Sequence, residues 1–244
     1  KRSLPCVMLV LGITFGTVYI NAEVGADWKK SRKDMYLTEP MFEILGMLDE
    51  YFGRFDPYTG RLNPDLIESF YPHEGKQADR LEELLRVHAA LTGTDKDWER
   101  EIGSQGHIFF HSQYLAKVIN SFYVKVEKID STLNPAIFDH ATQEEMLRFL
   151  QGAYARFGLE DKSSAIMMVN ANYKIETIAM VLKKLGCTDV VIYELRGLPS
   201  QYQVYFNPTS LVKKKLGIET VVLEPRNDRF NYPDWRVYQR IKKP

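Results

Sequence analysis

The amino-acid sequence predicts an α+β fold in which one structural unit occurs twice. Three pairs of similar segments support this prediction, and they follow the same order in both halves of the chain. The clearest pair is formed by residues 107–115 and 203–211, each a short alternating strand that leads into a helix. An ordered set of three pairs is harder to produce by chance than a single similarity. We therefore expect an internal duplication.

The other two pairs of segments are helical. Residues 42–53 and 175–186 both carry apolar side chains at helical spacing, and both end at a glycine suited to a left-handed C-cap. Residues 9–20 and 149–158 each have the pattern of an apolar, glycine-bearing helix that ends where a strand begins. Alternating or apolar runs predict strands over residues 17–24, 34–37, 106–111, 165–170, 189–195 and 202–207.

The two copies differ in length. The separation of matching segments falls from 140 residues for the first pair to 96 residues for the last, as an insertion in the first copy predicts. We place this insertion at residues 54–104, which contain a turn sequence at 56–60 and a charged amphipathic helix over 77–91. The predicted organisation is a first copy over 1–122, a linker over 123–140, a second copy over 141–225 and a basic C-terminal tail over 226–244.

The composition bounds the classes of function. An apolar fraction of 45% lets the 244 residues bury an ordinary core. The 32 acidic residues balance the 32 basic ones, whereas a dedicated duplex-binding protein usually carries a basic excess that neutralises phosphates. Residues 54–104 are acidic, with 7 Lys/Arg against 11 Asp/Glu. Any nucleic-acid surface should therefore lie outside this segment.

Cysteine usage and the N-terminal stretch bear on the compartment. Two cysteines, Cys6 and Cys187, give neither a disulfide framework nor a zinc site, and we expect both in the core of an intracellular protein in a reducing environment. The uncharged residues 3–22 imitate a signal peptide or a membrane span. Thr14 and Asn21 dilute this run, so we expect a buried packing helix and no membrane partner.

Two segments resemble the motif helices of the LAGLIDADG homing endonuclease and maturase family. In that family a helix carries the pattern Leu-x-Gly-x-x-x-x-Asp-Gly, and residues 11–20 and 150–158 have a similar pattern. The resemblance implies two pseudo-symmetric αββαββα repeats, a pseudo-dimer within one chain, whose sheets form a β-saddle. It also implies that the two helices pack side by side through small residues. The residues expected at this contact are Gly12, Gly16, Gly152 and Ala155.

The sequence departs from this family at the catalytic acids. In active members each motif helix ends in an aspartate, and the paired carboxylates hold divalent metals. The matching positions here are Thr17 and Phe157. A hydroxyl and a phenyl ring cannot replace these ligands, so we expect no catalytic residue, no metal site, no cofactor and no nuclease activity. Rescue by Glu160 or Asp161 would need a rebuilt helix end.

The remaining surface suggests a binding role. Alternation along the strands places His107, Phe109, Gln203 and Tyr205 on the concave face of the saddle, although a register shifted by one residue would reverse this. Aromatic side chains there favour stacking on unpaired RNA bases or contact with a protein. The candidate nucleic-acid-binding residues, which also include basic clusters, are Lys29, Lys30, Arg32, Lys33, Arg196, Gln203, Tyr205, Lys213, Lys214 and Arg240.

The resulting hypothesis is a non-catalytic protein that binds structured RNA. The resemblance points to a maturase-like splicing factor or a structural component of an organellar ribonucleoprotein, with the mitochondrion favoured on family grounds alone. One alternative is a protein-interaction subunit of a large assembly, held through the aromatic saddle or the acidic segment, without a nucleic-acid role. Another is a DNA-binding or active homing endonuclease. Neutral net charge favours the protein-interaction alternative, whereas the retained motif pattern favours nucleic acid.

Overall fold

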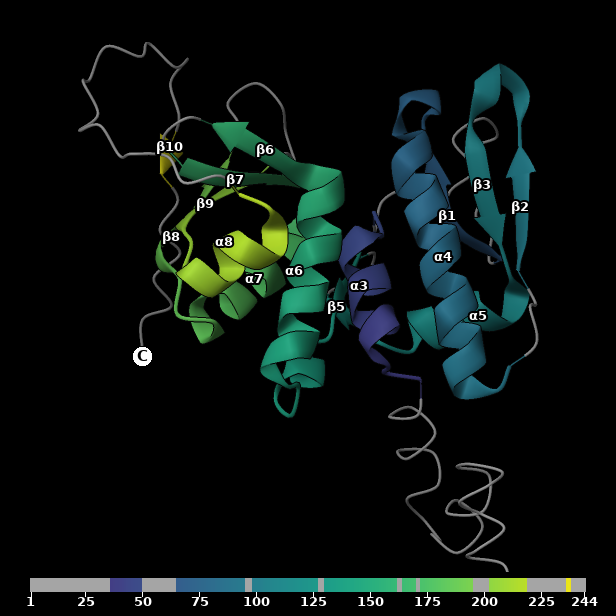
Figure 1. Ribbon diagram of the computed structural model, residues 1–244, viewed down its shortest axis with the longest axis horizontal. Coiled ribbons are helices and arrows are strands. Elements are labelled where there is room, and N and C mark those ends of the chain that lie inside the picture. Colours follow the sequence, from purple (N-terminus) through teal and green to yellow (C-terminus); the bar gives the residue numbers. More distant parts are fainter. Residues whose placement is uncertain are drawn as a thin grey trace, which may run out of the picture. The chain divides into compact units, whose positions relative to one another are not determined.

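A computed structural model describes residues 36–49, 65–94, 98–126, 130–161, 164–169, 172–194, 202–218 and 236–237. These residues form a mixed α/β fold with six α-helices and three antiparallel sheets (Figure 1). All of these elements belong to residues 38–244, a unit distinct from residues 1–37. No helix among the described residues is long and apolar enough to cross a membrane.

The helices begin at residues that suit their first turn. Thr38, Ser112, Thr142 and Thr209 are N-caps whose hydroxyl oxygens accept a hydrogen bond from a backbone N–H in the first turn. The helices are α3 (Glu39–Met47), α4 (Gly75–Thr92), α5 (Gln113–Asn120), α6 (Gln143–Phe157), α7 (Asn172–Lys184) and α8 (Ser210–Leu216). Short 3-10 turns are η3 (Pro72–Glu74), η4 (Ser104–Gly106) and η5 (Pro135–Phe138).

The strands form a three-stranded sheet, a five-stranded sheet and a hairpin. The three-stranded sheet has the order β1-β3-β2, and the five-stranded sheet has the order β10-β8-β9-β7-β6. The first sheet contains β1 (Leu66–Phe70), β2 (Glu99–Ile102) and β3 (Ile108–His111). The second contains β6 (Gly158–Asp161), β7 (Ser164–Val169), β8 (Thr188–Glu194), β9 (Tyr202–Asn207) and β10 (Arg236–Val237). The hairpin is β4 (Tyr123–Val126) with β5 (Asp130–Leu133), in the segment expected to be a linker.

A similar order of elements occurs on both sides of this hairpin, except that the second side has one additional strand, β6. Before it the chain runs α3, β1, α4, β2, β3, α5, and after it the chain runs α6, β6, β7, α7, β8, β9, α8. The strand order β1-β3-β2 of the first sheet equals the order β7-β9-β8 within the second. In each sheet two strands that follow one another in the chain pair antiparallel: β2 with β3, and β8 with β9.

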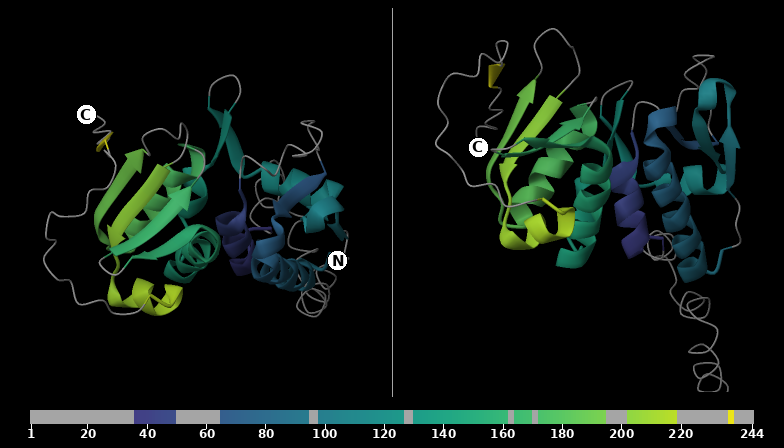
Figure 2. Two further views of the ribbon diagram at one scale, coloured as in Figure 1. Left: turned by 90° about the horizontal axis from the view of Figure 1, so that it is seen from above. Right: turned by 45° about the horizontal axis from the view of Figure 1, so that its top comes forward.

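Helices α3 and α6 pack directly against each other (Figures 1 and 2). Gly46 and Gly152 make this contact possible, because a methyl group on either one would overlap the backbone of the other helix. At Gly46 it would meet the carbonyl oxygen of Phe149, and at Gly152 the carbonyl oxygen of Glu43. Each glycine therefore faces the residue three positions before the other glycine, and the two backbones are in van der Waals contact.

The core lies on the helix-facing side of the sheets. Phe110 and Val204 are fully buried and Phe206 is nearly so. Helices α6 and α7 cover this side of the five-stranded sheet (Figure 2). Phe138 lies between Phe42 of α3 and Phe149 of α6, with ring centroids 5.7 Å and 4.8 Å away. Val204 and Phe206 of β9 thus lie on the predicted buried side, whereas Phe109 of β3 and Gln203 of β9, predicted to face outward, are buried as well.

The structure differs from three predictions about the first half. Residues 54–104 are not a surface insertion, because they supply β1, which is buried along its whole length, and α4, which packs on α3. The helix that packs on α6 through Gly152 is α3, whereas we expected residues 9–17 there; that segment lies outside the described residues. Residues 36 and 37 are a turn and coil and form no strand.

The strand predictions for the second half agree with the structure more closely than those for the first half. The range 202–207 agrees with β9, and the ranges 165–170 and 189–195 agree with β7 and β8 to within a residue at each described end. In the first half, 106–111 contains β3, whereas 17–24 lies outside the described residues. Alternation is therefore a reliable guide where a strand has one buried and one open face.

Candidate functional site at the ends of the paired helices

The C-terminal ends of α3 and α6 lie together, because both helices run past the same glycine contact. The family resemblance places one of the two metal-binding acids here, at Phe157 of α6. Helix α6 ends at Arg156 and Phe157, and α3 ends at Met47, followed by Leu48 and Asp49. The side chains at these ends define the candidate site, which we call the helix-end site.

Arg156 is the central side chain of the helix-end site. It is buried, with 3% of its side chain exposed, and its Nη1 lies 2.9 Å from Oε2 of Glu68 on β1. Nη1 also donates to the Met47 carbonyl oxygen at 3.0 Å, and Nη2 donates to the Ser69 carbonyl oxygen at 3.0 Å. Nε lies 3.3 Å from Oε1 of Glu74. One guanidinium thus joins α6 to the end of α3 and to β1.

Aromatic rings and a second cation complete the site. The Arg156 guanidinium carbon lies 4.6 Å from the ring centroid of Phe70 and 5.4 Å from that of Phe157, distances typical of cation–π contacts. Lys174 of α7 is buried, and its Nζ donates a hydrogen bond to the carbonyl oxygen of Leu48. The same Nζ lies 5.7 Å from the Phe157 ring centroid. Two internal cations therefore converge on the last carbonyls of α3.

Glu68 is the buried anion of the site. It is fully buried, and its carboxylate accepts hydrogen bonds from the backbone N–H of Asp49 at 2.5 Å and of Ser69 at 2.8 Å. Burial raises the pKa of Glu68 to about 7, and the attraction of Arg156 opposes this rise. The Arg156 pKa stays above its ordinary value against its own burial, because Glu68 and Glu74 lie beside it.

This arrangement favours internal hydrogen bonds and ion pairs over a bound cation. The negative end of the α3 dipole is already matched by Arg156 and Lys174. A divalent metal requires several oxygen ligands from carboxylates, and the described residues contain no group of three or more His, Cys, Asp or Glu side chains able to hold one. The chemistry that these residues support is structural cross-linking of the helix ends.

The structure places few of the predicted site residues at this site. Phe157 is part of it, and Gly152 lies in the helix contact next to it. Ala155 is exposed and takes no part in the glycine contact, because it lies on another face of α6. Thr17, Gly12, Gly16, Lys29, Lys30, Arg32, Lys33, Arg196 and Arg240 lie outside the described residues.

The predicted binding residues of the second half do not form one surface. Tyr205 is half-buried on the sheet side facing away from the helices, where its ring packs edge-on against Tyr193 with centroids 4.9 Å apart. Gln203 lies on the same side, is 7% exposed, and its Oε1 has no hydrogen-bond partner. Lys213 and Lys214 belong to α8, which packs on α6. They therefore lie with the helices, away from the tyrosines.

The three-stranded sheet carries a row of rings on its corresponding side. His107 lies 5.0 Å from Tyr71 and 6.3 Å from Phe109, and Phe109 lies 6.1 Å from His111, measured between ring centroids. Glu101 pairs across the strands with Phe109, and its carboxylate lies 3.8 Å from His111. We call these two ring-bearing sides, with Tyr71, His107, Phe109, His111, Tyr193 and Tyr205, the sheet faces.

Sequence reasoning missed Arg156, Lys174 and Glu68. One signal was available for Glu68, because it is a single acid within the apolar run 66–70, and a charge inside a strand that is buried on both sides needs a partner. Tyr71 was also missed, since its segment was assigned to an insertion. Arg156 and Lys174 carry no such signal, because helices commonly carry cations on solvent-exposed faces.

Comparison with known proteins gives a match at the level of fold. No family model matches the sequence, and no curated protein sequence matches it. A structure of mesophilic variants of the homing endonuclease I-DmoI matches with a TM-score of 0.50 at 10% identity, covering 73% of this chain and 87% of the other. The I-DmoI complex with DNA and Ca gives a TM-score of 0.51 at 11% identity over 70% and 84% of the two chains. The I-DmoI complex with DNA and Mn gives 0.50 at 11% identity over 78% and 99%. The described part of the chain thus has a fold similar to that of the LAGLIDADG homing endonucleases.

Proposed function

We propose that this protein binds nucleic acid, with RNA as its main ligand, and does not cleave it. The observation that carries the proposal is the helix-end site, where the cations of Arg156 and Lys174 lie beside Phe157, the residue that matches the second acid of the motif pattern. A fold shared with DNA-bound endonucleases supports the nucleic-acid part. The loss of acids supports the absence of cleavage.

Taking α3 as the first motif helix moves the first acid position from Thr17 to a residue after α3. In the motif pattern the acid follows the glycine by five residues, which gives Phe157 after Gly152 and Tyr51 after Gly46. The reciprocal packing of the two glycines supports treating α3 and α6 as equivalent helices of two repeats. The matching strand orders support the same duplication. Tyr51 replaces Thr17 in this proposal, and it lies outside the described residues.

The sheet faces favour RNA with unpaired bases over duplex DNA. The side chains that the structure describes on these faces are aromatic, apolar, amide, hydroxyl or acidic, and include no lysine or arginine. A duplex reader needs cations for phosphates and polar groups for base edges. Aromatic rings on a sheet can stack on splayed bases instead, and of those on the sheet faces Tyr71 is exposed and Tyr193 and Tyr205 are half-buried. A maturase-like or ribonucleoprotein role belongs to this proposal.

Two measurements on the purified full chain test the proposal. Incubation with plasmid DNA and a randomised duplex library in Mg²⁺ or Mn²⁺ should give no cleavage. Cleavage that disappears in Glu68→Gln or Asp49→Asn would contradict it, because those carboxylates would then be metal ligands. A cleavage activity that copurifies but survives both substitutions is assigned by testing Glu160→Gln and Asp161→Asn in the same way.

RNA binding is measured by fluorescence anisotropy with a labelled hairpin RNA that has a single-stranded loop. The double variant Tyr193→Ala, Tyr205→Ala should weaken binding about 10-fold or more, since base stacking contributes about 1–3 kcal/mol per base. The matched control is Tyr114→Ala, an exposed tyrosine on α5. Equal affinity for a fully paired DNA of the same length would contradict RNA as the main ligand.

A further inference from the structure

A groove lies among α3, α4 and α6, apart from the sheet faces. Its volume is about 550 Å³, and residues of all three helices line it. From α3 come Glu39, Pro40 and Glu43; from α4 come Arg80, Glu83, Leu84, Val87 and Leu91; from α6 comes Arg148. None of these side chains takes part in the helix-end site.

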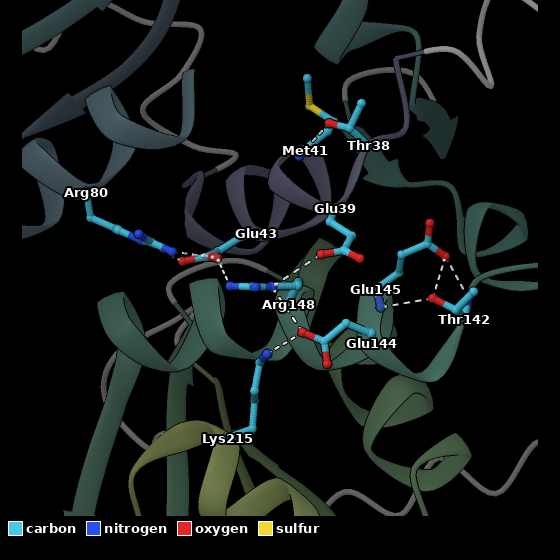
Figure 3. Close-up of polar contacts among 10 residues, drawn as sticks. All are labelled: Thr38, Glu39, Met41, Glu43, Arg80, Thr142, Glu144, Glu145, Arg148 and Lys215. Carbon is cyan, nitrogen blue, oxygen red and sulfur yellow. Dashed lines mark hydrogen bonds and ion pairs between the residues drawn. The ribbon is translucent and has the colours of Figure 1, made fainter. Parts of the chain in front are cut away.

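The polar floor of the groove is fixed by ion pairs (Figure 3). Glu43 is buried, and its carboxylate accepts hydrogen bonds from Nε and Nη2 of Arg80 at 2.8 Å and 3.0 Å. Arg148 approaches the same carboxylate from α6, with its Nη1 3.4 Å away. Both guanidinium groups therefore point inward and are occupied by Glu43, which leaves the floor rigid and its cations partnered.

The rim of the groove carries exposed carboxylates on opposite helices. The side chain of Glu39 on α3 is 53% exposed and that of Glu83 on α4 is 63% exposed. Each also pairs with an arginine of the floor, at 3.8 Å for Glu39 with Arg148 and 2.6 Å for Glu83 with Arg80. The arginines are about half as exposed, at 31% and 33%. A ligand approaching from solvent thus meets negative charge first.

An apolar strip continues from the acidic rim along α4. Val87 is 44% exposed and Leu91 is 61% exposed, and Leu84 lies buried beside them in the groove wall. Asp79, Glu83, Val87 and Leu91 follow one another at intervals of four, so they form one stripe on the helix surface. This stripe is about 18 Å long. Its first half is acidic and its second half is apolar.

We propose that this groove binds a basic amphipathic helix of a partner protein. Apolar side chains one turn apart on the partner cover Val87 and Leu91, and lysine or arginine side chains at its other end lie between Glu39 and Glu83. A helix suits the site because the groove is formed by helices and the stripe has helical length. The proposal rests on charge complementarity and exposed apolar area, and it is independent of nucleic-acid binding at the sheet faces.

The test uses two labelled peptides of about 15 residues, enough for about 22 Å of helix. Both peptides carry two leucines one turn apart at one end. At the other end, on the same face, the first peptide carries two lysines and the second carries two glutamates. Fluorescence anisotropy with the full chain should show binding of the lysine peptide at protein concentrations below about 0.1 mM. The glutamate peptide should bind at least about 10-fold more weakly.

Variants of exposed rim and strip residues identify the site without disturbing the core. Glu83→Lys should weaken the lysine peptide about 10-fold and strengthen the glutamate peptide, and Leu91→Ser should weaken both. The matched controls Glu99→Lys on β2 and Leu211→Ser on α8, also exposed, should leave both affinities unchanged. Circular dichroism melting checks that each variant folds.

Three outcomes would overturn the proposal. The first is the absence of lysine-peptide binding. The second is equal binding by the wild type, Glu83→Lys and Leu91→Ser proteins. The third is a dimer of the full chain in sedimentation that Leu91→Ser dissociates, because the groove would then be occupied by a second copy of this protein. Loss of RNA binding in the tyrosine variants has no bearing on these outcomes, so the two proposals fail separately.

Discussion

Buried charges at the helix ends show how single residues tie two helices and a strand together. Arg156 provides the positive charge and Glu68 the negative charge, and backbone groups of Asp49 and Ser69 hold the Glu68 carboxylate in place. A buried ion pair of this kind is costly to break on one side, because the remaining charge stays buried. The sequence predicted one residue of this cluster, Phe157, because the motif pattern marks that position. Arg156 precedes Phe157 on α6, whereas Glu68 comes from β1 and Lys174 from α7, and no local pattern links these three residues.

Glu68 should make the stability of the protein depend on pH. Its pKa is about 7 in the folded state and 4.5 when the chain is unfolded, so the folded state holds a proton that the unfolded state releases between these values. Stability is therefore greatest below pH 4.5 and falls as pH rises towards 7. The unfolding free energy lost between pH 4.5 and 7 is about 3 kcal/mol. Urea unfolding of the wild type and Glu68→Gln measures it.

The variant Glu68→Gln should lack this contribution. The unfolding free energy of the wild type, relative to that of Glu68→Gln, should therefore fall as pH rises from 4.5 to 7. His88 changes stability in the opposite direction, because burial lowers its pKa to about 4 and stability is lost as pH falls from 6.5. Comparing the wild type with Glu68→Gln at each pH removes the His88 contribution, because both proteins contain His88. A difference that grows more favourable to the wild type with rising pH would show that Glu68 is ionised throughout.

At the scale of elements, helix packing places α3 against α6. We predicted that residues 42–53, with apolar side chains at helical spacing, correspond to residues 175–186, which overlap α7. The contact between Gly46 and the Phe149 carbonyl shows that the helix in this segment packs on α6. Such a contact joins residues about a hundred positions apart, so local patterns do not contain it. The strands β9 and β3 were predictable because alternation is local.

The substitution Gly152→Ala should destabilise the protein by about 3 kcal/mol or more, because a methyl group overlaps the Glu43 carbonyl and the helices must separate. The loss should exceed the gain of about 1 kcal/mol that alanine gives within a helix. The matched control is Gly75→Ala at the start of α4, where a methyl group meets nothing within 4 Å. Urea unfolding measures both, and equal stabilities would contradict this account of the contact.

At the scale of the whole molecule, charge is the property that sequence gives most directly. The balance of 32 acidic and 32 basic residues correctly bounds the net charge at zero, but it does not locate surfaces. The acidic composition of residues 54–104 suggested a solvated insertion, although β1 and α4 belong to the core of the fold. Composition failed there because Glu68 of this segment is buried against Arg156 of α6, and Glu82 pairs with Arg100 of the same segment.

Zero net charge also predicts a weak dependence of RNA binding on salt. Each phosphate neutralised on a single strand contributes about −0.7 to the slope of log affinity against log salt concentration. Sheet faces that bind by stacking should neutralise few phosphates, and we expect a slope no steeper than about −2. Anisotropy titrations from about 50 to 200 mM KCl measure it. A slope near −5 would indicate a basic surface elsewhere on the protein and would remove the argument for stacking.

The packed interface between α3 and α6, which we call the seam, bears on whether the chain can be cut into two fragments that still associate. One helix of the seam precedes the β4–β5 hairpin and the other follows it, so a cut in that hairpin would leave each fragment with one sheet and one half of the seam. The covalent link then acts as a tether that sets an effective concentration in the millimolar range. Two co-expressed fragments that reassemble would replace this tether by ordinary affinity, and the gene for this protein would tolerate fission at that point.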